Sequence, residues 1–156
     1  MLAQAMDLAQ LVNWEFDVAT KTFMFDDRFY ALYGTSAERE GGTVMSVEKY
    51  GKEFVHPDDI HVMSDVARDI QSPHPSHVSM FEHRIIRRDG EVRHIVVRIA
   101  ITKDEQGRTV KTHGANQDIT DRKRMEESLR QANRKLGLLT GITRHDIKNQ
   151  LFALKA

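Results

Sequence analysis

The sequence contains no cysteine, three prolines and one tryptophan among its 156 residues. Without cysteine the chain has no disulfide framework, no thiolate zinc site and no thiol nucleophile. The 23 Lys+Arg residues equal the 23 Asp+Glu residues in number, so bulk charge gives no reason to bind nucleic acid or acidic lipid. No apolar run is long enough to span a bilayer, and the N-terminus lacks a secretory signal pattern. We therefore expect a cytoplasmic chain with no nucleic-acid or membrane contact of its own, whether or not its parent protein is attached to a membrane.

Three regions of the chain differ in composition. Residues 1–11 are weakly amphipathic and predict a short N-terminal helix. Residues 12–120 alternate strand and helix signals, and the 40% hydrophobic content of the chain suffices for a folded core. Residues 121–156 contain no proline and are densely charged, which predicts one long helix.

The central region predicts an α+β domain. Strand alternation occurs at residues 14–18, 22–25, 80–87, 92–102 and 109–117. Helical spacing occurs at residues 28–32, 46–54 and 57–70, whereas the polar residues 38–43, with two glycines, predict a mobile loop. Asp89-Gly90 between two strand patterns predicts a hairpin. Two strands, several helices and three longer antiparallel strands should form a sheet covered by helices on one face.

Four motifs in this region resemble those of PAS domains, in the same order and at similar separations. They are WEFD at 14–17 with FYALYG at 29–34, HPDD at 56–59, RDGEVR at 88–93 and GANQDITDRK at 114–123. The resemblance places a PAS sensory domain at residues 12–120. It implies a five-stranded antiparallel sheet whose concave face is roofed by helices. In that family the concavity often holds a small molecule or cofactor.

The inner face of the predicted sheet offers a candidate ligand site. By alternation Phe81, His83 and Ile85 share one face of their strand. Either this face lines an apolar cavity with His83 as its polar group, or the core is fully packed and satisfies His83 internally.

The sequence leaves the cofactor of such a cavity unknown. Flavin photoadduct chemistry needs a cysteine, so that kind of PAS domain is excluded. Haem needs an axial ligand, and His61 lies on the helix where some haem-binding PAS domains carry one. Its polar neighbours favour an ordinary surface histidine, so we do not expect haem. His74 and His77 flank a Pro-Ser turn with no carboxylate nearby, so we expect no metal site.

The end of the PAS-like region carries a candidate coupling element. Asp118, Ile119 and Thr120 resemble the Asp-Ile-Thr junction that ends many PAS domains. Thr120 or Asp121 can accept the unpaired N–H groups of the following helix, and Asp118 can bond to nearby backbone or to a cation. An ordinary helix cap explains these residues equally well. Signal coupling requires in addition that the joint transmit strain.

Residues 121–141 have the pattern of a signalling coiled-coil helix. Apolar residues recur in steps of four, three, four and three, at Met125, Leu129, Ala132, Leu136 and Leu139. A helix this polar is marginal in isolation, so we expect a parallel homodimer through this helix and the PAS domain. The alternative is a helix that packs against its own sheet.

The segment TRHDIKNQL at 143–151 resembles the phospho-acceptor box of sensor histidine kinases. In that family ATP phosphorylates a histidine, which passes the phosphoryl group to an aspartate of a response regulator receiver domain. The resemblance implies His145 as phospho-acceptor, Asp146 as acid/base partner and Asn149 as the amide of the phosphatase reaction. A second subfamily pairs an acidic residue with a glutamine four positions later, which makes Gln150 the alternative amide. The box departs from the commonest pattern, because no proline follows the histidine and Asn149-Gln150 replaces Thr-Pro.

Residues 142–156 thus look like the truncated start of a kinase dimerisation and phospho-acceptor helix. The chain has no glycine-rich nucleotide loop, so we expect it to be inactive alone, with ATP acting in the full-length kinase. Two functions fit this organisation. The first is the PAS sensory module of a two-component histidine kinase. The second is a PAS module for dimerisation or partner docking with no phosphotransfer role.

Overall fold

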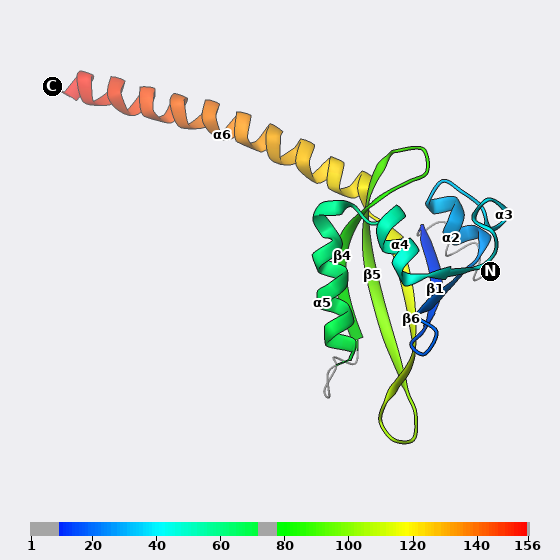
Figure 1. The fold of residues 1–156 in the computed structure, drawn as a ribbon. Helices are drawn as coiled ribbons and strands as arrows, with labels where there is room; N and C mark the ends of the chain where they lie inside the picture. Colours follow the sequence, from blue (N-terminus) through cyan, green and yellow to red (C-terminus); the bar gives the residue numbers. More distant parts are fainter. Residues whose placement is uncertain (1–9, 72–77, 156) are drawn as a thin grey trace, which may run out of the picture. The chain divides into compact units, whose positions relative to one another are not determined.

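A computed structural model describes residues 10–71 and 78–155, with side chains described up to residue 138 except at positions 78 and 79. The chain divides into two compact units, Met1–Thr120 and Asp121–Ala156. The first unit is built on a six-stranded antiparallel sheet with the strand order β3-β2-β1-β6-β5-β4 (Figure 1). Its strands are β1 (Leu11–Asp17), β2 (Thr22–Phe25), β3 (Val44–Ser46), β4 (Val78–Ile86), β5 (Val92–Lys103) and β6 (Thr109–Asp118).

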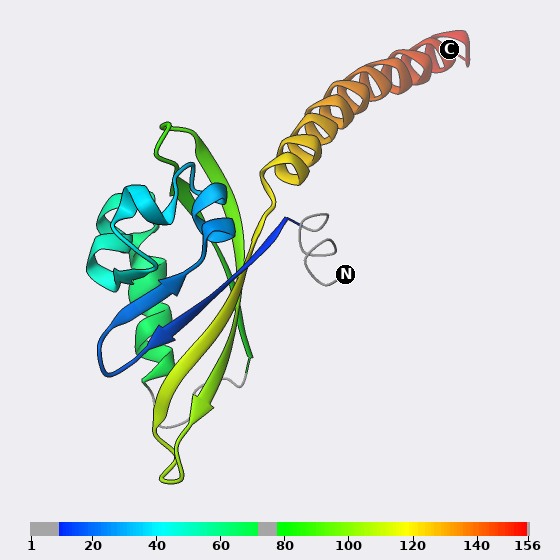
Figure 2. The same cartoon turned by 90° about the vertical axis from the view of Figure 1, so that its right-hand side faces the viewer.

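Helices cover one face of this curled sheet (Figure 2). They are α2 (Asp27–Leu32), α3 (Ala37–Glu40), α4 (Val47–Glu53), the 3-10 turn η1 (Pro57–Asp59) and α5 (Ile60–Ile70). The predicted α+β architecture is confirmed, with its early strand pair, its helical segment and its three longer antiparallel strands. The predicted hairpin between β4 and β5 turns at Gly90, which has φ 87°.

The prediction of five strands is wrong, because the sheet has a sixth strand at its edge. β3 pairs with β2, with Phe23 opposite Met45. Met45 is buried between the exposed residues Val44 and Ser46, so the strand alternation is present over only three residues. A pattern this short cannot be separated from the loop before it or the helix after it.

The loop predicted at residues 38–43 instead overlaps one helical turn, α3. Ser36 caps this turn by accepting a hydrogen bond from the Arg39 N–H, and Gly41 ends it in the left-handed conformation at φ 87°. The start signal, Ser36, thus lies just before the predicted loop, and the stop signal, Gly41, lies within it. These two signals are sufficient for a single turn.

The core lies between the inner sheet face and the helices, and its densest part is aromatic. Phe25 stacks on Phe29 with ring centroids 3.7 Å apart, and Phe29 stacks on Tyr33 at 4.4 Å. Tyr50 of α4 packs on the same group through Phe23. In contrast, α5 contains no buried residue. The fully buried aromatic residues therefore gather on the side formed by β2, α2 and α4, whereas α5 contributes partly buried side chains to the core.

Asp59 fixes η1 and the start of α5 to β4. Its carboxylate accepts hydrogen bonds from the backbone N–H of Arg84 at 2.7 Å, from Nε at 3.0 Å and from Nη2 at 2.7 Å. The bonds to the Arg84 side chain hold the pKa of Asp59 well below its ordinary value of 3.8. The HPDD motif therefore has a structural role in this chain, because its last carboxylate ties a helix to a strand 25 residues away.

The helix α6 (Thr120–Lys155) is uninterrupted, and from Asp121 onward it belongs to the second unit. None of the helices in the described part of the chain is long and apolar enough to cross a membrane. At the other terminus β1 begins at Leu11, so the predicted N-terminal helix does not reach this residue. The remainder of that prediction, at residues 1–9, lies outside the described residues.

We predict that Asp59→Asn lowers the free energy of unfolding by about 2 kcal/mol at neutral pH, because charge-assisted bonds to Arg84 are weakened. Folding holds the pKa of Asp59 below its unfolded value, so this contribution is present above about pH 4 and is lost as the pH falls further. Urea unfolding at several pH values should show a gap between wild type and variant that closes in acid. Asp58→Asn changes an exposed carboxylate of the same motif and is the matched control. Equal losses in the two variants would contradict the assignment.

Candidate functional site

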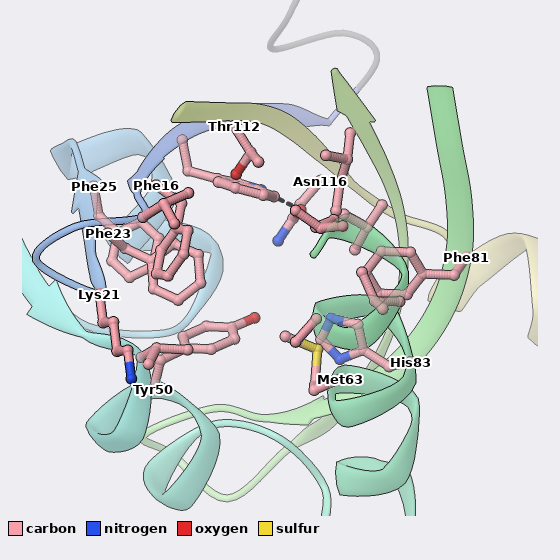
Figure 3. A pocket seen from close by; sticks show the side chains of 18 of the residues that line it. Phe16, Lys21, Phe23, Phe25, Tyr50, Met63, Phe81, His83, Thr112 and Asn116 are labelled. Atoms are coloured by element: carbon pink, nitrogen blue, oxygen red, sulfur yellow. Dashed lines mark hydrogen bonds between the residues drawn. The ribbon is translucent and has the colours of Figure 1, made fainter. Parts of the chain in front are cut away.

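A cavity of about 300 Å³ lies between the inner sheet face and the helices (Figure 3). Phe81 and His83 of β4 line it, whereas Ile85, predicted on the same face, is packed in the core. Aromatic side chains from β1, β2, α2 and α4 also line it: Trp14, Phe16, Phe23, Phe25, Phe29 and Tyr50. This volume is at the small end of the range for ligand pockets, so the cavity suits a small organic molecule.

The helix α5 covers the cavity. Its apolar stripe, which includes Met63, Val66 and Ile70, lines the cavity. These three side chains are partly buried and pack against the core cluster, although no residue of α5 is fully buried.

Trp14 forms part of the cavity wall because residue 114 is a glycine. The two residues are direct partners across β1 and β6. A Cβ placed at Gly114 would overlap the indole ring. The absence of a side chain on β6 therefore lets the indole lie against the strand, where its edge also meets Phe23 at a centroid distance of 5.3 Å.

A chain of four buried polar side chains runs through the aromatic wall. The indole N–H of Trp14 donates to Asn116 Oδ1 at 2.7 Å, and Asn116 Nδ2 donates to the Tyr33 hydroxyl at 3.0 Å. The hydroxyls of Tyr33 and Tyr50 are 2.7 Å apart. Burial raises the pKa of both tyrosines, so both hydroxyls stay neutral and keep their protons. The chain links β1, β6 and α4 and ends at the cavity, which Tyr50 and Asn116 both line.

His83 is hydrogen-bonded internally at one ring nitrogen. Its Nδ1 lies 3.2 Å from the carbonyl oxygen of Arg84, which can only accept, so Nδ1 carries the proton of the neutral ring. Burial lowers the pKa of His83, which favours that neutral form. Nε2 is then an acceptor that has no partner among the described residues. His83 is only 4% exposed and lines the cavity.

Asp118, Ile119 and Thr120 form a buried joint between β6 and α6. Asp118 Oδ1 accepts the backbone N–H of Thr120 at 2.9 Å and its hydroxyl at 2.6 Å. Thr120 Oγ1 accepts the N–H of His94 on β5 at 2.8 Å, and the Ile119 N–H donates to the His94 carbonyl at 2.9 Å. Arg93 donates to Asp118 Oδ2 at 3.1 Å. The first residue of α6 is thus hydrogen-bonded to two neighbouring strands.

Two short connections join the cavity to this joint. Along β6, Asn116 lies two residues before Asp118 and therefore on the same sheet face. Across the sheet, Asp118 is opposite Ile95, which is opposite His83. Neighbouring strands lie about 4.8 Å apart, so His83 and Asp118 are separated by about 10 Å. A displacement at the cavity wall has little distance to travel before it reaches the joint.

The other residues singled out by the sequence are not part of the cavity. His61 is exposed on α5 and does not line the cavity, and His74 and His77 lie outside the described residues. Within the described part of the chain, no three His, Asp or Glu side chains gather as a metal site would require. The box residues His145, Asp146, Asn149 and Gln150 lie in α6, but their side chains are outside the described set.

Sequence reasoning missed the polar chain. Asn116 belongs to the motif that was interpreted only as a strand–helix junction, although Thr112, Gly114 and Asn116 alternate onto one face. A buried asparagine beside a glycine on that face was the available signal. The partners Tyr33 and Tyr50 could not be assigned from sequence, because each depends on long-range packing.

We predict that Gly114→Ala pushes Trp14 off β6, breaks its bond to Asn116 and lowers the free energy of unfolding by about 1–3 kcal/mol. Trp14 is the only tryptophan in the sequence, so its fluorescence emission reports the displacement directly. Gly51→Ala is the matched control, because a Cβ there meets nothing within 4 Å. It should leave the emission unchanged and slightly stabilise α4. Unaltered emission and stability in Gly114→Ala would contradict the close approach of the indole.

The chain matches the family model of the PAS fold over residues 22–116, more than half of its length. A methyl sulfide methyltransferase-associated sensor from Methanosarcina acetivorans is 32% identical over 85 residues, which are 54% of this chain. The chain spans 8% of the length of that relative.

Two solved structures have a similar fold. A sensory box histidine kinase/response regulator from Burkholderia thailandensis superposes with a TM-score of 0.67 at 24% identity, covering 86% of this chain and 96% of the other. The N-terminal domain of a diguanylate cyclase with a PAS/PAC sensor from Marinobacter aquaeolei gives 0.58 at 22% identity, covering 70% and 95%. At these identities the likeness shows the fold alone. Because the family model matches more than half of the chain, the chain belongs to the PAS fold family.

Proposed function

We propose that this PAS domain is the sensory module of a two-component sensor histidine kinase. In this proposal a signal in the cavity shifts the joint at Asp118, Ile119 and Thr120, and α6 carries the shift to His145. The kinase autophosphorylates His145 with ATP, and the phosphoryl group passes to a response regulator receiver domain. The protein acts in the cytoplasm, because ATP and response regulators are found there. The similarity to a sensor and to a sensory box histidine kinase/response regulator supports this assignment.

The observation that carries the proposal is the hydrogen-bonded start of α6. Asp118 and Thr120 are both buried, with exposures of 9% and 2%. Their bonds tie the first helical residue to β6 and β5, and β6 also supplies Asn116 to the cavity. A strand that moves under a ligand therefore moves the origin of the helix with it. An ordinary helix cap needs only to satisfy the N–H groups of the first turn of α6. The bond from the His94 N–H to Thr120 goes beyond that requirement, because it attaches the helix to β5.

The long helix supplies a path to His145. α6 is continuous from Thr120 to Lys155, and the 25 residues from Thr120 to His145 correspond to about 38 Å at 1.5 Å per residue. Its heptad positions Met125, Leu129 and Leu136 are 72%, 62% and 60% exposed. Pairing with a second copy would bury these side chains, so we propose a parallel homodimer in which α6 is a coiled-coil helix and the PAS domains also meet. A change of a few kcal/mol in the preferred arrangement of such a pair suffices to switch access to the histidine.

The residue types of the box suit phosphoryl transfer. A neutral imidazole nitrogen of His145 is a good nucleophile near neutral pH. The adjacent carboxylate of Asp146 can orient the ring and accept its proton. An amide one turn later, from Asn149 or alternatively Gln150, can position a water for the reverse reaction. These roles are assigned from the resemblance of the box and from its chemistry.

We predict that His145 is labelled when radioactive ATP and a matching kinase catalytic domain are supplied in trans to the chain extended through the second helix of the hairpin. The label should be acid-labile, as expected for a phosphorylated imidazole, and His145→Gln should abolish it. His113→Gln, which changes an exposed histidine of the sheet, should leave it unaltered. A folded dimer that takes no label would instead favour a PAS module for dimerisation or partner docking.

We predict that Thr120→Val changes the rate of His145 labelling although residue 120 is about 38 Å away along the helix. The valine has the same shape but cannot accept the His94 N–H, so the free energy of unfolding should also fall by about 1–3 kcal/mol. Thr102→Val, at an exposed position of β5, is the matched control and should alter neither quantity. If folded Thr120→Val is labelled at the wild-type rate, the joint does not couple the two units.

A further inference from the structure

Lys21 occupies a backbone conformation that its residue type disfavours. It lies in the turn between β1 and β2 with φ 55°, in the left-handed region where glycine and asparagine are the usual residues. The turn holds it there, since the Lys21 N–H donates to the Asp17 carbonyl at 2.9 Å and its own carbonyl accepts from the Val47 N–H at 3.0 Å. A lysine retained at a strained turn position points to a use for its side chain.

The side chain of Lys21 runs along the rim of the cavity (Figure 3). Among the described residues its ammonium group has no ion-pair or hydrogen-bond partner. It is the one charged side chain among the described residues that line the cavity, and that set includes no aspartate or glutamate. The carboxylate of the same turn, Asp17, accepts the Thr20 N–H. The rim therefore offers an uncompensated positive charge to whatever enters.

The interior of the cavity suits a flat ring. Its wall contains rings in stacked and edge-on arrangements, for example Phe23 against Phe25 and Trp14 against Phe23. Aromatic pairs in such geometries gain more than their buried area alone provides.

We propose that the cavity binds a small aromatic monocarboxylate, with its ring among the aromatic side chains and its carboxylate on the Lys21 ammonium group. This inference rests on the proposed function in taking the cavity as the sensory site. It goes further by naming the chemical class of the signal. A phenyl or similar single-ring acid fits a cavity of about 300 Å³, and the charge at the rim favours an acid over a neutral or cationic analogue.

The test uses Trp14 as an internal reporter, because the only tryptophan of the sequence lines the cavity. The full chain is titrated with phenylacetate while the indole is excited at the red edge of its absorption, where a phenyl ring does not absorb. Phenylacetamide, which has the same shape without the charge, should bind about tenfold more weakly. Hexanoate, an aliphatic acid, should also bind more weakly than phenylacetate.

Lys21→Gly is the decisive variant, because it removes the charge and also relieves the backbone strain. It should unfold at a higher urea concentration than wild type, bind phenylacetate about tenfold more weakly and lose the preference for the acid over the amide. Lys21→Arg should keep that preference. Equal affinities of wild type and Lys21→Gly for phenylacetate, equal binding of acid and amide by wild type, hexanoate binding as tight as that of phenylacetate, or no response of Trp14 to phenylacetate would each overturn the proposal.

The experiments distinguish a wrong ligand class from a wrong proposed function. Phenylacetate that binds with the expected charge dependence but leaves His145 labelling unchanged would overturn the coupling and retain the ligand class. Labelling of His145 that is lost in His145→Gln, in a chain that does not bind phenylacetate, would retain the kinase role and overturn the ligand class.

Discussion

The contact between Trp14 and Gly114 is the constraint on which the cavity side of this domain depends. Because β6 presents no side chain at that position, the indole lies against the strand and brings its N–H to Asn116. Asn116 is thereby oriented toward Tyr33, and Tyr33 toward Tyr50. One missing Cβ thus determines the position of the indole, the polar chain and the wall of the cavity. A larger residue at position 114 would disturb all three together.

The domain combines firmly held edges with a cavity under α5. Asp59 and Arg84 fasten the start of α5 to β4, and Asp118 and Thr120 fasten the start of α6 to β5 and β6. Between these fixed points α5 covers the cavity without a buried residue of its own. With the starts of α5 and α6 fixed in this way, side chains that line the cavity can move while both helices stay attached to the sheet. The hydrogen bonds at the joint are those that the proposed coupling requires.

The features that could be predicted from sequence are those encoded within a few residues. Asp89-Gly90 specified the hairpin between β4 and β5, because a glycine at positive φ is required there. Asp118 was predicted to bond to nearby backbone, and its bonds to Thr120 follow from spacing alone. The Thr120 hydroxyl, one of the two groups predicted to accept a helix N–H, instead accepts the His94 N–H across the sheet. β3 and α3 were missed because three or four residues carry too little periodicity. The partners in the polar chain could not be predicted either, because Asn116 and Tyr33 are 83 positions apart in the sequence.

The order of strands in the sheet has a consequence for synthesis of the protein. β1 lies between β2 and β6, so the first of these six strands to be synthesised must wait for the last before its second edge is paired. The bond from Trp14 to Asn116 spans 102 positions, and contacts of such separation form late in folding. Thr120 comes directly after β6 in the sequence, and its hydrogen bonds to His94 and Asp118 form only when β5 and β6 are in place. The start of α6 is therefore anchored only after the sheet of the PAS domain has closed.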